Sequence, residues 1–187
     1  MFIEDQVWPK RCGHLPGKEV IPTGQWLAKL QAAVDHRRRH LFVTARTDAR
    51  AAVDLDEAIA RASAAADVGV DAVFVEPPES VAELETVAAA LPGVTLVANM
   101  VEGGRTPLLT PTELAELGFG LIVSPLSLLF AATRAMADAA AALRRDGTLR
   151  DRTTALVGFD DFAALVDLDA HVELDHRYGS PPGSSAK

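Results

Sequence analysis

Short apolar segments alternate with longer segments whose apolar residues recur every three or four positions. The short segments read as β-strands apolar on both faces, which is typical of parallel strands covered by helices. The longer segments have the spacing of amphipathic helices. The pattern predicts five βα units. Strands are expected at 2–3, 41–45, 72–75, 95–98 and 121–123, and helices over 26–37, 54–69, 80–91, 110–118 and 127–145.

Capping residues mark several of these helices. Asp54 and Thr110 each precede a glutamate by three residues, as in a capping box, and Gly118 is a typical helix stop. The periodicity weakens after residue 147, and one or two short helices are expected between 151 and 178. We expect one domain over 1–178 and a Gly/Pro/Ser-rich, disordered tail at 179–187.

Each predicted strand ends in polar residues. A (β/α)₈ barrel gathers its strand ends around one mouth, whereas an open doubly wound sheet binds ligands at a switch point, usually with a glycine-rich phosphate loop. No such loop occurs in the sequence, so the strand ends favour the barrel. A complete barrel needs about 250 residues, so an incomplete α/β barrel is predicted. The polar residues are Glu4, Asp5, Arg46, Asp48, Glu76, Asn99 and Ser124.

Composition excludes several classes of protein. The chain has 187 residues, 49% of them hydrophobic, and a net charge of -8, which opposes nucleic-acid binding. The basic cluster at 36–40 reads as a helix end, where cations suit the dipole. Cys12 is the one cysteine, no apolar run reaches the ~18 residues of a membrane span, and no signal peptide is evident. A cytoplasmic protein without a membrane partner is expected.

The loop after the first strand carries the strongest chemical signal. Lys10, Arg11 and His14 surround Cys12, and Gly13 lets the loop bend. Neighbouring cations favour the thiolate, the reactive form of cysteine. Taken alone, the string is also compatible with a cysteine that has no chemical role.

Seven segments, in order and at matching spacing, resemble the isocitrate lyase/phosphoenolpyruvate mutase superfamily. The combination of Glu4–Gln6 with Lys10–His14 is most similar to its 2-methylisocitrate lyase branch. The likeness covers residues 2 to about 148. The segments are Ile3–Gln6, Pro9–His14, Ala45–Ala49, Phe74–Glu76, Ala98–Asn99, Thr106–Leu108 and Pro125–Ser127.

The resemblance implies a Mg²⁺-dependent carbon–carbon lyase that converts a hydroxy acid such as 2-methylisocitrate to succinate and pyruvate. Mg²⁺ would stabilise the developing negative charge. Cys12, on a loop that closes over substrate, would protonate the succinate carbanion, with Lys10 and His14 holding its charge state. Gly13 would line the substrate site.

The resemblance also assigns roles at the strand ends. Glu4 would lie in the outer shell of Mg²⁺. Arg46 would bind a substrate carboxylate, although an ion pair with Asp48 or Glu76 is an alternative. Glu76 would lie near the loop that carries Cys12 (the cysteine loop), or else supply a charge at a helix N-terminus. Asn99 would bind the departing carboxylate beside the backbone of Met100 and Val101, or else cap backbone groups.

Two departures from the family pattern leave alternatives open. The chain begins at what would be the fourth barrel strand, so the aspartates that hold Mg²⁺ directly in the family are missing from it. Phe130 and the region of Phe159 stand where the lyase branch carries arginines for a tricarboxylate. A related lyase for oxaloacetate or a malate derivative is therefore an alternative. So are a non-catalytic truncated relative and an unrelated open α/β binding protein.

The expected partners are a small hydroxy- or oxo-carboxylic acid and further copies of the chain. In the family the last helix is exchanged between subunits. Thr153–Val172 is the segment expected to do so, with Phe159, Phe162, Leu165 and Val166 as its apolar face.

Overall fold

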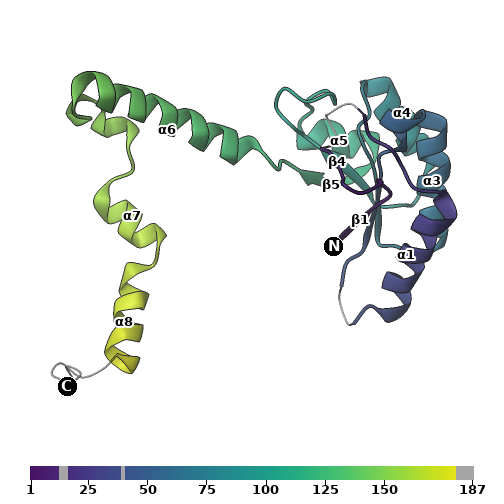
Figure 1. The fold of residues 1–187 in the computed structure, drawn as a ribbon, viewed down its shortest axis with the longest axis horizontal. Helices are drawn as coiled ribbons and strands as arrows, with labels where there is room; N and C mark the ends of the chain where they lie inside the picture. The colour runs from purple at the N-terminus through teal and green to yellow at the C-terminus, as the bar shows by residue number, and fades with distance from the viewer. Residues whose placement is uncertain (13–16, 39–40, 180–187) are drawn as a thin grey trace. The chain divides into compact units, whose positions relative to one another are not determined.

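The computed structural model describes residues 1–12, 17–38 and 41–179. The chain forms two compact units, residues 1–131 and the part from Ala132 onward. The first unit holds the five strands and the first four helices of the predicted βα repeat, and the boundary falls within the fifth helix, Ser127–Asp146 (Figure 1). The single domain expected over 1–178 stays a prediction, and the expected tail, apart from Gly179, lies outside the described residues.

The strands of the first unit form one parallel sheet in which every strand lies beside its predecessor in the sequence. Glu4 pairs with Arg46, and Asn99 pairs with Val123, in neighbouring strands. A doubly wound sheet reverses its strand order at a switch point, whereas a barrel adds strands in sequence. The order confirms the barrel-type α/β fold. The strands are β1 (Phe2–Glu4), β2 (Thr44–Thr47), β3 (Ala72–Val75), β4 (Leu96–Asn99) and β5 (Phe119–Val123).

Predicted capping residues begin the helices. The Asp54 carboxylate accepts a hydrogen bond from the Glu57 backbone N–H at 2.8 Å. Thr110 and Glu113 form a complete capping box, and Gly118 ends that helix with φ of 101°. The helices are α1 (Thr23–His36), α2 (Ala49–Ala52), α3 (Leu55–Asp67), α4 (Val81–Ala90), α5 (Pro111–Leu117) and α6 (Ser127–Asp146).

The second strand differs from its prediction. The apolar run from Leu41 predicts a strand at 41–45, but the ladder with β1 begins at Thr44, and Leu41 and Phe42 are exposed. β2 continues to Thr47, whose hydroxyl donates to the buried Asp5 carboxylate at 2.6 Å. The four-residue helix α2, which follows β2, is too short to show a helical period and was not predicted.

The two faces of the sheet differ in how they are covered. One face packs on the helices and forms the main core, which includes Trp26. The other carries Ala72, Phe74 and Val97. Phe2 meets Phe74 edge to face, with ring centroids 6.1 Å apart, yet is 47% exposed. A cavity of about 250 Å³ lies on this face, lined by Phe2, Arg46, Phe74, Asn99, Val123 and Pro125.

The second unit consists of helices. After α6 come a 3₁₀ helix at Arg150–Ala155, α7 (Phe159–Leu165) and α8 (Leu168–Tyr178), in agreement with the short helices expected there. Phe159 and Leu165 are 87% and 77% exposed. In the part of the chain that the structure describes, none of the helices has the length and apolar character of a membrane span.

Candidate active site

The carboxyl ends of the strands meet at a cavity of about 320 Å³. β1 contributes Glu4, β2 contributes Arg46, and β4 contributes Asn99. The loop after β1 brings Cys12 to the same cavity, so that Cys12 and Arg46 share it, as the barrel hypothesis requires. The lining residues are Glu4, Lys10, Arg11, Cys12, Arg46, Glu76, Asn99, Val101, Pro125 and Leu126.

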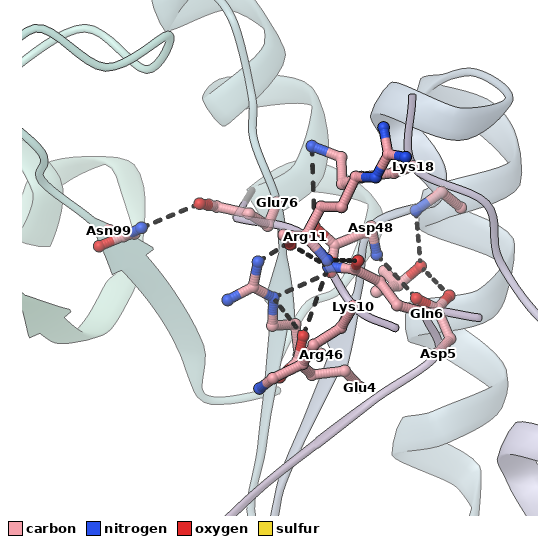
Figure 2. Close-up of polar contacts among 12 residues, drawn as sticks. Glu4, Asp5, Gln6, Lys10, Arg11, Lys18, Arg46, Asp48, Glu76 and Asn99 are labelled. Atoms are coloured by element: carbon pink, nitrogen blue, oxygen red, sulfur yellow. Dashed lines mark hydrogen bonds and ion pairs between the residues drawn. The ribbon is translucent and has the colours of Figure 1, made fainter. Parts of the chain in front are cut away.

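Arg46 is held in the cavity wall by a buried carboxylate. Its Nε and Nη2 donate to the two carboxylate oxygens of Asp48, each at 3.0 Å (Figure 2). Its Nε also lies 3.9 Å from Glu4, and its guanidinium lies 5.1 Å from the Phe74 ring centroid. Asp48 is fully buried, whereas the Arg46 side chain is 18% exposed. The predicted pairing of Arg46 with Asp48 is confirmed.

Gln6 fixes the start of the cysteine loop. Its side-chain amide donates to the Arg11 carbonyl at 2.9 Å, and its side-chain oxygen accepts from the Arg11 backbone N–H at 2.8 Å. Lys10 donates to the Glu4 carboxylate at the cavity rim. The predicted site residues Gly13 and His14 lie outside the described residues.

Glu76 and Asn99 form a buried pair at the cavity wall. The Asn99 side-chain amide donates to Glu76 Oε1 at 2.9 Å, and Glu76 is 1% exposed (Figure 2). Burial raises the pKa of Glu76 from 4.5 to about 7, against the lowering effects of the Asn99 hydrogen bond and the Arg46 charge. Among the described residues, the buried Asn99 Oδ1 has no hydrogen-bond partner.

The contacts of Glu76 and Asn99 show their local surroundings, while their roles in substrate binding stay predictions. Glu76 is not a helix-end charge, because Ser80 caps α4 instead. Asn99 binds a side chain rather than capping backbone groups. Val101 lines the cavity, and the Met100 side chain belongs to the main core and accepts from the Leu109 backbone N–H. The contact of the Met100 and Val101 backbone with a bound carboxylate stays a prediction.

A layer of buried polar groups behind the cavity was not recognised from the sequence. Asp5 is fully buried and accepts from the Thr47 hydroxyl, the Asp48 backbone N–H and the Arg61 guanidinium, at 2.6, 2.9 and 3.2 Å. Burial raises the pKa of Asp5, while these hydrogen bonds oppose the rise. The layer ties β1 to β2 and α3 and so fixes the strand ends that carry the site.

Lys18 is the second feature that sequence reasoning missed. Its side chain is 1% exposed, and its ammonium lies 3.9 Å from Asp48 Oδ1. Burial lowers the pKa of Lys18, against the opposing charge of Asp48. No local pattern marks this contact, because Asp48 lies thirty positions later in the chain.

The carboxylates at the cavity do not fit a resident magnesium ion by themselves. Glu4 is bonded to Lys10 and faces Arg46, and Asp48 is held by Arg46. Within residues 1–12, 17–38 and 41–179, no three His, Cys, Asp or Glu side chains are grouped so that they could hold a metal. Mg²⁺ prefers several oxygen ligands in near-octahedral geometry, which this set does not supply.

Comparison with known proteins shows a consistent set of relatives. A family model for phosphoenolpyruvate phosphomutase matches residues 1–144. A chloroplastic carboxyvinyl-carboxyphosphonate phosphorylmutase from Arabidopsis thaliana is 45% identical, covering 96% of this chain and 54% of the relative. A 2-methylisocitrate lyase from Bacillus subtilis is 41% identical, covering 71% and 44%. The chain thus spans about half the length of these curated relatives.

Solved structures give the same picture of the fold. A 2,3-dimethylmalate lyase, a member of the PEP mutase/isocitrate lyase superfamily, has a TM-score of 0.86 at 34% identity and covers 100% of this chain and 62% of its own. Oxaloacetate acetylhydrolase with 3,3-difluorooxalacetate has a TM-score of 0.86 at 31% identity, with 97% and 61% covered. Phosphonopyruvate hydrolase with oxalate and Mg²⁺ has a TM-score of 0.79 at 26% identity, with 96% and 62% covered.

Proposed function

The chain belongs to the phosphoenolpyruvate mutase/isocitrate lyase superfamily, and we propose that it carries the carboxylate-binding and proton-donating part of a carbon–carbon lyase site. The proposed substrate is a 2-methylisocitrate-like hydroxy acid, and the products are succinate and pyruvate. The observation that carries the proposal is one cavity lined by both the Cys12 thiol and the Arg46 guanidinium.

Arg46 and Cys12 have separate roles in the proposed reaction. The Arg46 guanidinium, held in place by Asp48, binds a substrate carboxylate. A base accepts the proton of the substrate hydroxyl, whose oxygen becomes the carbonyl oxygen of pyruvate, while the electrons of the broken C–C bond pass to the succinate fragment. The Cys12 thiol then protonates that carbanion. Lys10 and His14 stay the predicted residues that set the charge of the thiol.

Asn99 and Glu76 form a further part of the cavity wall in this proposal. Asn99 Oδ1 is a buried acceptor at the cavity and is suited to a donor group of the bound acid. Glu76 holds the Asn99 amide in place through a 2.9 Å hydrogen bond. The Val101 side chain adds apolar surface beside them, and Gly13 stays a predicted part of the substrate site.

Mg²⁺ is proposed as the cofactor because a similar structure, a phosphonopyruvate hydrolase, contains oxalate and Mg²⁺. When bound, the ion would stabilise negative charge on the oxygen of the hydroxy or oxo acid. Glu4 stays a predicted outer contact acting through water. The direct ligands are not found among the described residues.

A malate derivative or oxaloacetate is the second candidate substrate. The described cations in the cavity wall are Lys10, Arg11 and Arg46, and Lys10 is paired with Glu4. Pro125 and Leu126 form an apolar part of the wall. This balance favours an acid with fewer carboxylates than a tricarboxylate. Proteins of similar structure include a 2,3-dimethylmalate lyase and an oxaloacetate acetylhydrolase.

Product analysis tests the proposed activity. The purified chain is incubated with Mg²⁺ and, separately, with 2-methylisocitrate, 2,3-dimethylmalate and oxaloacetate, and the released acids are separated by chromatography. Succinate with pyruvate supports the first candidate, and propionate with pyruvate, or oxalate with acetate, supports the second. Cys12→Ser should abolish release, and Lys29→Met, on the exposed side of α1, should not. A folded chain that releases no product from any of the three acids overturns the proposal.

A homo-oligomer that exchanges the segment Thr153–Val172 is proposed as the working assembly. Phe159, Phe162 and Leu165 are 87%, 51% and 77% exposed, so they are suited to pack against a second copy. Sedimentation velocity of the chain should show an oligomer, and Phe159→Ser with Leu165→Ser should shift it to a monomer. A monomeric wild-type chain contradicts this assembly.

A further inference from the structure

Lys18 lies behind the cavity rather than in its wall. The return of the loop between β1 and α1 places it there, because the Val7 N–H donates to the Glu19 carbonyl and the Ile21 N–H donates to the Asp5 carbonyl, each at 2.8 Å. The ammonium approaches the same Asp48 oxygen that accepts from Arg46 Nη2 (Figure 2). One buried carboxylate therefore serves two cations.

Without Lys18, the charges around Asp48 would cancel. Arg46 and Asp48 form one neutral pair, and Lys10 and Glu4 form another. With Lys18 removed, the arginine that faces the cavity would be neutralised completely by Asp48. With Lys18 present, Asp48 is shared, and one positive charge remains unbalanced among these five groups. Arg11 adds positive charge at the rim, and Glu76 subtracts charge only when it is ionised.

We propose that Lys18 is a positioning residue that offsets the charge of Asp48, so that Arg46 presents net positive potential to a carboxylate ligand that Lys18 itself never touches. The ligand class rests on the proposed function, whereas the electrostatic effect on the cavity does not. Lys18 acts through Asp48 in this scheme, since its side chain is only 1% exposed.

Cys12 supplies a reporter of the potential in this cavity. It is the only cysteine in the sequence, it is exposed, and it lines the cavity with Arg46. Its alkylation rate is measured with anionic iodoacetate and with neutral iodoacetamide. The same thiolate attacks both reagents and displaces iodide, so the ratio of the two rates cancels any change in thiolate fraction and reports the local potential.

Lys18→Met should lower the iodoacetate/iodoacetamide rate ratio by about two- to fivefold, as expected for the loss of one partly screened charge. Lys18→Arg should restore the wild-type ratio, because it keeps the charge. Lys29→Met, which removes an exposed lysine from α1, should leave the ratio unchanged. Each variant is compared at equal helix content by circular dichroism. An unchanged ratio in folded Lys18→Met overturns the inference.

A measurement on the wild-type chain covers the case in which Lys18→Met does not fold. The ratio should be higher in the folded chain than in the same chain unfolded in concentrated urea, and the difference should shrink with added salt. Equal ratios in the folded and unfolded chains overturn the inference. Neither measurement requires turnover, so an inactive chain would contradict the proposed lyase without deciding the role of Lys18.

Discussion

Arg46 and Asp48 lie two residues apart at the end of β2, and their side chains meet through two parallel hydrogen bonds of 3.0 Å. The carboxylate is fully buried, while the guanidinium reaches the cavity shared with Cys12. Asp48 also receives Lys18 from behind at 3.9 Å. The orientation of Arg46 is therefore set by Asp48, a residue that does not line the cavity.

Asp48→Ala should destabilise the chain because it leaves Arg46 and the buried Lys18 without their shared carboxylate. The expected loss is about 3–5 kcal/mol in the free energy of unfolding, measured by urea denaturation. Asp35→Asn, which changes an exposed carboxylate of α1 that accepts from Gln31, should stay within about 0.5 kcal/mol of wild type. A loss at Asp48 no larger than that at Asp35 would show that the pair contributes little.

Gly17→Ala should destabilise the end of the cysteine loop. Gly17 has φ of +75°, which strains any residue with a Cβ, and that Cβ would lie 2.7 Å from Arg11 Nη1. Because the arginine end can move, the backbone strain dominates, with an expected cost of about 1–2 kcal/mol by urea denaturation. Gly24→Ala in α1 meets no atom within 4 Å and should be neutral or stabilising. Equal effects of the two substitutions would contradict this account.

The alternation of apolar segments was enough to predict the parallel sheet. Strands buried on both faces are short apolar runs, whereas helices bury residues at every third or fourth position, so the two can be told apart in the sequence. The predicted bounds of β2 were displaced toward the N-terminus. Leu41 and Phe42 are apolar, as is typical of a buried strand, but they are exposed. Thr47 is polar, yet it pairs with β3 and donates a hydrogen bond to Asp5. Hydrophobicity is a local property, while the ladder depends on partners far along the chain.

The sequence predicted which strand-end residues belong to the candidate site, but not the partners that orient them. Strand-end residues such as Arg46 and Asn99 converge because carboxyl ends of parallel strands share one edge. The partners that orient them could not be inferred in the same way. Arg61 reaches Asp5 across 56 positions, and Lys18 reaches Asp48 across thirty, and neither separation leaves a local pattern.

Arg46→Lys should lower kcat/KM for product release strongly and have a smaller effect on the free energy of unfolding. Lysine keeps the positive charge but cannot bind Asp48 and a substrate carboxylate with one planar fork. The expected drop in kcat/KM is at least about tenfold, which corresponds to the loss of one charge-assisted hydrogen bond. Arg38→Lys, at an exposed position after α1, serves as the matched control and should change neither quantity. Wild-type kcat/KM in Arg46→Lys would contradict the role given to the guanidinium.

Glu76 should make the stability of the chain depend on pH in a defined direction. Its pKa is raised by burial from 4.5 to about 7, so the folded state holds a proton that the unfolded state releases. The stabilisation from the neutral carboxyl is complete below pH 4.5 and is lost as the pH rises from there to about 7, by up to about 3 kcal/mol.

Glu76→Gln keeps the acceptor for the Asn99 amide but cannot ionise, so it should be stabilised relative to wild type at pH 8 and not at pH 4.5. Urea denaturation of both proteins at the two pH values measures this difference, in which the titration of Asp5 and other shared groups cancels. The same pH dependence in wild type and Glu76→Gln would mean that Glu76 ionises in the folded chain as readily as in the unfolded one.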